Sequence, residues 1–373
     1  MAIASIKEVA QLASVSVGTV SNVLNRPDAV APATRERVLN AMNQLGFVRN
    51  ESARALRSGR TRTIGLVVLD VTNPFFTDVV KGVEATADAN GMIISLCNSD
   101  QDGPRERRYL DHLEEQRVQG ILITPVEGET ERLEQLIDRG TPVVLLDHRA
   151  TVRNRCSAAV DDVLGGGLAA EHLLSQGHRR LAFVGGPHTI SQVAERYKGA
   201  SETVKAAGGV AGRAAPGGPS PDAGEVPSLV RVDVPSLSFA SGRHAAGSLA
   251  ALPPEQRPTA LFCANDLLAL GIMHGLTVAG LRVPDDVALI GYDDIDFAEA
   301  AAVPLSSIRQ PRRELGRMAA ELLLEEIDEG ERHRHRQVLF QPELMVRASS
   351  VRAAWSPTAP DHMGDQRSGK DIR

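Results

Sequence analysis

Cysteine is scarce in this chain, which has three thiols among its 373 residues. Cys97, Cys156 and Cys263 lie far apart and form no C-x-x-C pair. Disulfide frameworks and zinc ribbons need closely spaced cysteines, so we expect neither. Reduced thiols of this kind are typical of a cytoplasmic protein.

Long apolar runs and an export signal are also missing. A membrane-spanning helix needs about 20 mostly apolar residues, and no run of that kind occurs. The opening segment MAIASIKE lacks a basic stretch followed by an apolar one, so we expect no signal peptide. The sequence therefore predicts a cytoplasmic protein with no membrane partner.

The usual catalytic motifs are absent as well. The sequence has neither a G-x-S-x-G elbow nor an H-E-x-x-H pair, and its ten histidines are scattered. The run 165–170 fits the nucleotide pattern G-x-G-x-x-A in form, but no acidic residue closes a following strand as that pattern requires. We interpret this run as a place of close helix packing, and we expect neither an enzyme nor a cofactor.

Two histidines near the end of the chain, His333 and His335, hint at a metal site. They alternate with Arg332, Arg334 and Arg336. These guanidinium groups would repel a cation. A charged surface turn is therefore the favoured interpretation, and no metal is expected.

Charge is distributed unevenly along the chain. The formal net charge is −6, yet residues 1–60 hold eight basic and four acidic side chains, so a head of charge +4 precedes a body of charge −10. A basic head indicates a polyanionic partner, which the acidic body would repel. A solvated arginine-rich surface explains the excess equally well, so charge alone does not decide.

Two short amphipathic helices are predicted within the first 25 residues. Ser5 and Glu8 form an S-x-x-E capping box ahead of apolar residues at helical spacing. A second helix has an apolar side formed by Val20, Val23 and Leu24. Its cap and other faces carry small, uncharged side chains, namely Ser16, Val17, Gly18, Thr19, Ser21, Asn22 and Asn25. The major groove of B-DNA accepts such a face, so duplex DNA is the expected partner.

The rest of the chain divides into a linker, an α/β body and a tail. A third helix is predicted from Pro32 to Leu45 and is followed by a short alanine-rich linker, 47–62, which we expect to fold as a helix only when docked. Beyond it, apolar strands alternate with helices, which indicates open, doubly wound sheets, and the length favours two of them. We expect 206–227 to be a mobile loop and 351–373 a disordered tail.

Several motifs follow one another in a fixed order over most of the chain. They are IKEVA at 6–10, TVSNVLN at 19–25, RERV at 35–38, LGF at 45–47, ARALRSGRTRTIG at 53–65, NPFF at 73–76, GHRR at 177–180, ND at 265–266, LRVPDDV at 281–287, IGYDD at 290–294 and IRQ at 308–310. In these motifs the sequence resembles the LacI/GalR family of bacterial transcriptional repressors.

The resemblance implies a fold and an assembly. The fold is a small all-α helix-turn-helix headpiece (1–46), a hinge helix (47–62) and an α/β core (63–350) of two doubly wound parallel-sheet lobes, as in periplasmic binding proteins. The family works as homodimers on near-palindromic operators, because a two-fold protein needs a two-fold site. The expected crossings between the lobes lie near residues 161, 291 and 322. The N-terminal lobe would take about 63–161 and 292–322, and the C-terminal lobe about 162–291 and 323–350.

By resemblance, the second helix and the hinge contact DNA. The expected contact residues are Ser5, Ser16, Val17, Gly18, Thr19, Ser21, Asn22 and Asn25 in the headpiece, and Ala53, Leu56 and Arg57 in the hinge. Asn22 stands where many relatives have arginine, so we expect an altered base preference, since asparagine pairs with adenine. Leu56 is expected to wedge into the minor groove. Thr19 and Ser21 could instead act as caps or phosphate contacts.

An effector pocket is expected between the lobes, where strand ends converge. The candidate residues are Phe75, Phe76, His148, Arg149, Asp161, Arg196, Asn265 and Asp293, with Asp147 beside them. The guanidinium of Arg196, the carboxylate of Asp293 and the amide of Asn265 suit a polyhydroxyl ligand such as a sugar. The two phenylalanines could stack on a ring or belong to the lobe core, and we expect one of them in the pocket.

The combined prediction is a cytoplasmic, nucleoid-associated, homodimeric repressor whose effector biases lobe closure and thereby the hinge helices. Two other classes share the core, namely a sugar-binding transport receptor and a nucleotide-dependent α/β enzyme. The missing export signal and the basic head argue against the first. Missing catalytic groups argue against the second.

Overall fold

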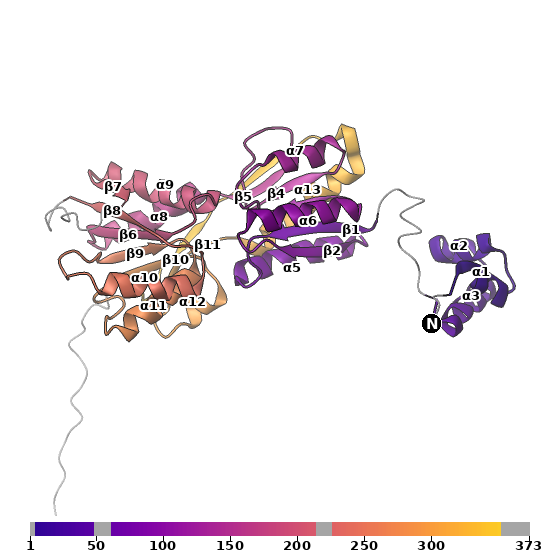
Figure 1. Ribbon diagram of the computed structural model, residues 1–373, viewed down its shortest axis with the longest axis horizontal. Helices are drawn as coiled ribbons and strands as arrows, with labels where there is room; N and C mark the ends of the chain where they lie inside the picture. Colours follow the sequence, from indigo (N-terminus) through magenta and orange to yellow (C-terminus); the bar gives the residue numbers. More distant parts are fainter. Residues whose placement is uncertain (1–3, 48–60, 214–225, 352–373) are drawn as a thin grey trace, which may run out of the picture. The chain divides into compact units, whose positions relative to one another are not determined.

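The computed structural model describes residues 4–47, 61–213 and 226–351, and the chain divides into two compact units, Met1–Thr61 and Arg62–Arg373 (Figure 1). The predicted hinge contacts Ala53, Leu56 and Arg57 lie outside the described residues, as does almost all of the predicted tail. The side chain of Asn25 is also outside the description. Among the described helices, none combines the length and apolar character of a membrane span.

The first unit contains the three predicted helices. They are α1 (Ile6–Leu12), α2 (Val17–Asn25) and α3 (Pro32–Leu45), with a 3-10 turn at Pro27–Ala29. Ser5 and Glu8 form the predicted capping box, in which the backbone N–H of Ser5 donates to Glu8 Oε2 over 2.6 Å. Gly46 ends α3 in the left-handed conformation, with φ of 57°, which glycine adopts at no steric cost. Local sequence signals therefore set these helix boundaries.

The three helices enclose one small hydrophobic core. Its buried members come from all three helices and their turns, namely Val9, Ala10, Ala13, Val20, Val23, Val38, Ala41 and Met42. The apolar side of α2 predicted from the sequence faces this core, since Val20 and Val23 are buried. The opposite side of α2 is therefore available to a partner.

The N-terminal lobe of the second unit is built on a six-stranded parallel sheet, with strand order β12-β5-β4-β3-β1-β2. The strands are β1 (Thr63–Val68), β2 (Ile93–Asn98), β3 (Ile121–Ile123), β4 (Val143–Leu146), β5 (Ser157–Val160) and β12 (Gln337–Phe340). Its helices are α5 (Pro74–Ala89), α6 (Gly103–Glu115), α7 (Glu131–Asp138) and α13 (Arg312–Glu329). Two hydrophobic clusters lie against this sheet, one including residues of α6 and α7 and the other residues of α5 and α13.

The C-terminal lobe is built on a seven-stranded sheet, with strand order β13-β11-β10-β9-β6-β8-β7. The strands are β6 (Arg180–Gly185), β7 (Val210–Arg213), β8 (Ser228–Asp233), β9 (Ala260–Cys263), β10 (Ala288–Asp293), β11 (Ser306–Arg309) and β13 (Glu343–Met345). Its helices are α8 (Asp162–Ser175), α9 (Ser191–Ala206), α10 (Phe239–Ala250), α11 (Asp266–Val278) and α12 (Asp296–Ala300). All strand pairs are parallel except β11 with β13. The doubly wound core predicted from the sequence is thus present in both lobes.

The chain crosses between the lobes at different places from those expected, apart from the crossing near residue 161. Strands β10 and β11 pair within the C-terminal sheet, so the expected crossing near 291 is wrong, and the chain leaves this lobe after Arg309. Strand β12 pairs with β5 in the N-terminal sheet, so the expected crossing near 322 is also wrong, and the chain returns after Phe340. Strand pairing over long sequence separations decides lobe membership, and motif spacing does not report it.

Two further expectations concern loops and glycines. The stretch 206–227 is not entirely a loop, because Val210–Arg213 forms the edge strand β7 beside β8. The glycine run at 165–170 does serve close packing: a Cβ on Gly166 would lie 2.0 Å from the carbonyl oxygen of Arg196. Helices α8 and α9 therefore touch backbone to backbone, and this contact places Arg196 against α8.

Candidate DNA-reading face and effector site

The outward side of α2 carries small, uncharged side chains. Val17, Gly18 and Asn22 are exposed, whereas Thr19 and Ser21 are half-buried. The helix VGTVSNVLN contains no charged residue. An exposed helical face of this size and polarity matches what a DNA major groove can receive.

The hydroxyl groups at the start of α2 are engaged in the cap. Ser16 Oγ accepts a hydrogen bond from the backbone N–H of Thr19 over 3.0 Å, and it lies 2.9 Å from Thr19 Oγ1. This geometry makes Ser16 the N-cap of α2 and holds the Thr19 hydroxyl against it. Asn22, one turn further on, carries an exposed amide group. It is the side chain on this face best suited to read a base edge.

Asp293 is the centre of a buried polar cluster between the lobes. It ends β10 with φ of 107°, a conformation that costs an L residue roughly 1–3 kcal/mol. The amide of Asn73, which caps α5 in the N-terminal lobe, donates to Asp293 Oδ2 over 3.1 Å. The amide of Gln310, at the second crossing, donates to Asp293 Oδ1 over 2.8 Å. The Asp293 carboxylate thus joins both lobes.

Arg196 brings the positive charge to this cluster. Its Nε donates to Asp162 Oδ1 over 2.7 Å and its Nη1 to the carbonyl of Ala264 over 2.7 Å. The guanidinium lies 3.6 Å from the centre of the Tyr292 ring and 3.9 Å from Asp293 Oδ1. Burial alone would lower the pKa of Arg196, but the surrounding carboxylates outweigh it and raise the pKa. Arg196 is therefore a permanent cation inside the core.

A second set of contacts across the cleft starts at the end of β4. Gln192 on α9 donates through its side-chain amide to the backbone oxygen of Asp147 and, over 3.1 Å, to Asp147 Oδ2. His148 Nδ1 lies 2.8 Å from Ser191 Oγ. Burial lowers the pKa of His148, so the ring is neutral at pH 7. The described cleft is therefore in a closed state, with the lobes joined by side-chain contacts.

Carboxylates outnumber cations in this cluster. Burial, and then the charge of Asp162, raises the pKa of Asp147 well above its usual range. Burial raises the pKa of Asp293 to about 6, against the lowering effect of Arg196. Burial and the charge of Asp293 raise the pKa of Asp266 as well. The cluster thus crowds several carboxyl groups around one guanidinium, and a ligand with hydroxyl groups can hydrogen-bond to these carboxyl groups in either protonation state.

The structure brings together only some of the predicted effector residues. Arg196, Asp293, Asp147 and His148 lie in the buried cluster. Asn265 is also buried, but its amide is used to cap α11 and to donate to the carbonyl of Leu237. Asn265 therefore fixes the start of α11 and the backbone at Leu237.

Other predicted residues lie apart from the centre of this cluster. Phe75 and Phe76 form an edge-to-face pair in the hydrophobic core, so the structure places both in the lobe core. Asp161 caps α8 by accepting from Leu164, and Arg149 is exposed.

Sequence reasoning missed several members of the cluster. Asn73, Asp162, Gln192, Tyr292 and Gln310 all contribute side chains to it. Three of these, Asn73, Tyr292 and Gln310, lie inside motifs that mark the family resemblance, so the signal was present but was assigned no role. No sequence motif includes Gln192. Its role depends on the closure of the lobes, which places its side chain against Asp147.

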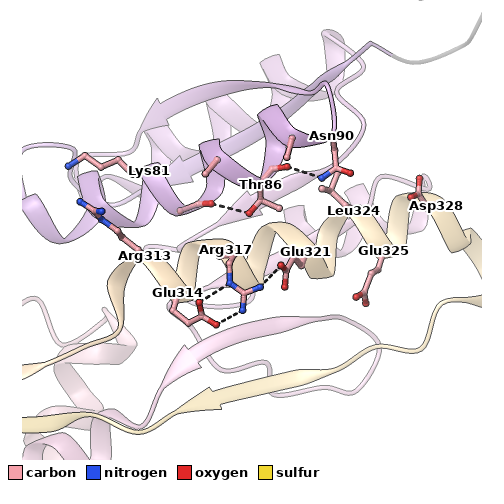
Figure 2. Close-up of a pocket in the computed structure, with 13 residues that line it drawn as sticks. Lys81, Thr86, Asn90, Arg313, Glu314, Arg317, Glu321, Leu324, Glu325 and Asp328 are labelled. Carbon is pink, nitrogen blue, oxygen red and sulfur yellow. Dashed lines mark hydrogen bonds and ion pairs between the residues drawn. The ribbon is translucent and has the colours of Figure 1, made fainter.

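A separate groove of about 750 Å³ lies between α5 and α13 of the N-terminal lobe (Figure 2). Figure 2 shows Arg317 between Glu314 and Glu321, with which it forms ion pairs along its own helix. None of the predicted effector residues lines this groove. The groove therefore adds nothing to the effector site.

The comparisons with known proteins agree with this architecture. Residues 5–50 match the model for bacterial regulatory proteins of the lacI family, and residues 61–218 match the model for periplasmic binding proteins and the sugar-binding domain of the LacI family. Residues 170–350 match a periplasmic binding protein-like domain. The helix-turn-helix head and bilobed core thus define a DNA-binding regulator with a binding-protein-like body.

Full-length relatives specify the family. The HTH-type transcriptional repressor PurR of Vibrio vulnificus is 36% identical over 92% of this chain and 98% of its own length. A solved complex of the transcriptional regulator CelR with cellobiose is 32% identical, with a TM-score of 0.65, and covers 93% of this chain and 99% of its own. A LacI family regulator of Enterococcus faecium with bound ribose is 29% identical, with a TM-score of 0.66, over 78% of this chain and 98% of its own. The chain belongs to the LacI family of bacterial regulatory proteins.

Proposed function

We propose that this protein is a homodimeric transcriptional repressor whose affinity for operator DNA is set by a small polyhydroxyl effector held between its lobes. The observation that carries the proposal is the buried cluster around Asp293, with its hydrogen bonds across the cleft. Within the described residues, Asp147 Oδ1 and Gln310 Oε1 are buried without a hydrogen-bond partner. Such atoms carry a free-energy cost that a ligand can remove.

The effector chemistry follows from the donors and acceptors in the cluster. Carboxylates of Asp147 and Asp293 accept hydrogen bonds from vicinal hydroxyls, and Arg196 donates in a planar fork. Two structural neighbours of this chain carry cellobiose and ribose. These observations favour a sugar or related polyol as the effector of this protein.

The DNA contacts rest on the outward face of α2. Asn22 reads an adenine, Val17 and Gly18 pack against the neighbouring base edges, and Ser16 and Thr19 support the helix start. Ala53, Leu56 and Arg57 complete the contact in the minor groove, by the family resemblance. Two copies of the head then bind the half-sites of a near-palindrome, and the protein works in the cytoplasm on the nucleoid.

The effector acts by favouring one arrangement of the lobes. A ligand shifts such an equilibrium only through its difference in affinity for the two arrangements. In the closed arrangement described, Asn73, Gln192 and Ser191 reach across the cleft. A coupling of about 1–3 kcal/mol between effector and operator is typical of such switches.

The decisive experiment combines DNA binding with a ligand screen. An operator selected from a random duplex pool is titrated with the full-length protein at several salt concentrations, with and without sugars, polyols and nucleosides. We expect sequence-specific binding whose log affinity falls with log salt, and one sugar or polyol that changes it by about 5–150-fold. Equal binding to operator and random duplex under all conditions would contradict the regulator. A response to nucleosides alone would contradict the polyol class.

Paired variants locate the ligand. Asp293→Asn removes an acceptor from the cluster and is expected to abolish the effector response. Asp296→Asn makes the same change on a side chain that is 93% exposed on α12 and serves as the control. An unchanged response in Asp293→Asn would place the effector elsewhere.

A further inference from the structure

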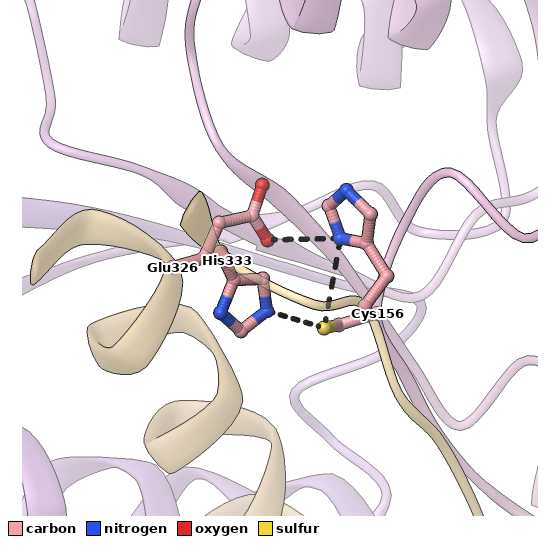
Figure 3. A group of neighbouring side chains, drawn as sticks. Cys156, Glu326 and His333 are labelled. Atoms are coloured by element: carbon pink, nitrogen blue, oxygen red, sulfur yellow. Dashed lines mark hydrogen bonds and ion pairs between the residues drawn. The ribbon is translucent and has the colours of Figure 1, made fainter. Parts of the chain in front are cut away.

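Four side chains with metal-binding atoms meet at one end of the N-terminal sheet. Cys156 directly precedes β5, Glu326 lies on α13, and His333 and His335 lie just before β12. One sulfur, two imidazole and one carboxylate donor atom from these residues all lie within 4.8 Å of one another. Figure 3 shows Cys156, Glu326 and His333 turned toward a common centre. The parallel pairing of β5 with β12, from Gln337 against Ser157 onward, brings the group together.

The distances match those of a tetrahedral zinc site. Cys156 Sγ lies 3.1 Å from His333 Nε2 and 3.8 Å from His335 Nδ1, and His335 Nδ1 lies 3.9 Å from Glu326 Oε2. Bonds of about 2.3 Å to sulfur and 2.0–2.1 Å to nitrogen place tetrahedral ligands about 3.5 Å apart. Small side-chain movements would therefore complete the coordination. The thiolate and imidazole donors favour Zn²⁺ over Mg²⁺ or Ca²⁺.

Three of the four donor side chains, those of Cys156, Glu326 and His333, are largely shielded from water. The Cys156 residue is fully buried and the His333 side chain is 3% exposed. Glu326 Oε2 is buried and has no hydrogen-bond partner within the described part of the chain. An unsatisfied carboxylate oxygen of this kind is costly. A cation beside it would satisfy the carboxylate and the thiolate together.

The arginines that the sequence analysis expected to repel a cation are neutralised or exposed. Arg336 pairs with Glu325, and Arg332 and Arg334 are exposed. Arg155, the buried neighbour of Cys156, pairs with Glu129 and Glu134.

A further carboxylate orients one of the imidazoles. Glu329 Oε2 lies 3.1 Å from His333 Nδ1, so that Nε2 is the nitrogen facing the cysteine. Carboxylate–histidine–zinc arrangements orient metal ligands in this way.

We propose that Cys156, Glu326, His333 and His335 bind one Zn²⁺ ion that fastens α13 and β12 to β5. Four protein ligands leave no open position, which is the pattern of a structural site. The site lies at the start of parallel strands β5 and β12, whereas the effector cluster lies at strand ends, so the ion stabilises the lobe and takes no part in effector binding.

The test uses the full-length, untagged protein under reducing conditions. Chelator-treated protein is titrated with Zn²⁺ by calorimetry and with Co²⁺ by absorption spectroscopy. We expect one ion per chain, a cobalt spectrum of tetrahedral type with a thiolate charge-transfer band, and a higher melting temperature in zinc. Cys156→Ser is expected to remove the charge-transfer band and weaken zinc binding by more than about 10-fold, since even changes beside the ligands cost about 10–100-fold.

Two additional variants protect the test against misfolding and chance binding. His335→Ala removes a ligand whose side chain is 28% exposed, so the fold should persist while zinc binding weakens. His112→Ala removes a surface histidine of α6 that is 60% exposed, and binding should stay unchanged. A cobalt spectrum without the thiolate band, or equal zinc affinity in His335→Ala and the unaltered protein, would overturn the proposal.

Discussion

The DNA-reading face of α2 and the polar cluster of the cleft differ in their charge, in their exposure and in how their residues are brought together. The face on α2 comes from nine consecutive residues, carries no charge and is exposed on its outer side. The cleft buries Asp147, Asp162 and Asp293 around Arg196, and its contacts join residues as far as 220 apart in the chain. Exposed residues that make no cap, such as Asn22, can change with little effect on stability. Residues in the cleft cannot, because each buried charge depends on the others.

The largest expected effect comes from removing the guanidinium of Arg196, which is buried inside this cluster. Arg196→Ala leaves the carboxyl groups of Asp162 and Asp293 buried without this cation, and we expect the free energy of unfolding to fall by about 3–5 kcal/mol. Urea unfolding of the full-length protein measures it. Arg149→Ala, an exposed neighbour of the cleft, should change stability by less than about 0.5 kcal/mol. If the free energy of unfolding of Arg196→Ala fell by less than about 1 kcal/mol, the carboxyl groups would not need a cation in order to stay buried.

A smaller effect concerns pH. The pKa of Asp293 is about 6 in the folded protein against an ordinary 3.8, so the folded state binds the proton more tightly. The contribution of Asp293 to the free energy of unfolding is fully present below about pH 4 and is lost as the pH rises to about 6. The difference in unfolding free energy between the unaltered protein and Asp293→Asn should therefore fall, on the order of 1–3 kcal/mol, over this window. Asp296→Asn should show no such slope; a flat difference for Asp293→Asn would refute the raised pKa.

On the head, the expected effect is on DNA discrimination and not on stability. Asn22→Ala should reduce discrimination at one adenine of the selected operator by about 1–3 kcal/mol, measured by fluorescence anisotropy against operators altered one base pair at a time. Asn43→Ala, an exposed asparagine on α3, is the matched control. If Asn22→Ala weakened binding equally to every sequence, Asn22 would be a phosphate contact.

The smallest effect is that of the cap of α2. Ser16→Ala removes the acceptor for the Thr19 amide and should destabilise the helix by about 0.5–2 kcal/mol. Amide hydrogen exchange of α2 in the full-length protein would reveal it as faster exchange. Ser16→Asp should restore slow exchange, because aspartate also caps, while weakening DNA binding through its charge. Equal amide exchange rates in the unaltered protein, Ser16→Ala and Ser16→Asp would show that the cap does not stabilise α2.

The head was predictable because its signals are local. The capping box of Ser5 and Glu8, the Ser16 cap and the Gly46 terminator each involve residues within a few positions of one another. The alternation of strands and helices was predictable for the same reason. Lobe membership was not, because β12 joins β5 across about half of the chain.

The candidate effector site was predictable only in part. Arg196 and Asp293 were identified by resemblance, whereas Asp162 became visible only when α9 packed against α8, and Gln192 only when the lobes closed on Asp147. Asn265 and the pair Phe75 and Phe76 show the reverse case. Their residue types suit a ligand, but the structure uses them for a helix cap and for the core.

The sequence by itself determined the helices of the head, the neutral face of α2 and the doubly wound class of the body. These features depend on hydrophobic periodicity and helix capping, which involve residues close together in the chain. Only the tertiary structure decided which charges share the cleft, where the chain crosses between lobes, and that Cys156 meets two histidines. These contacts arise when parallel strands pair and helices pack at van der Waals distance. Spacing along the chain carries no information about which distant side chains that packing will bury together.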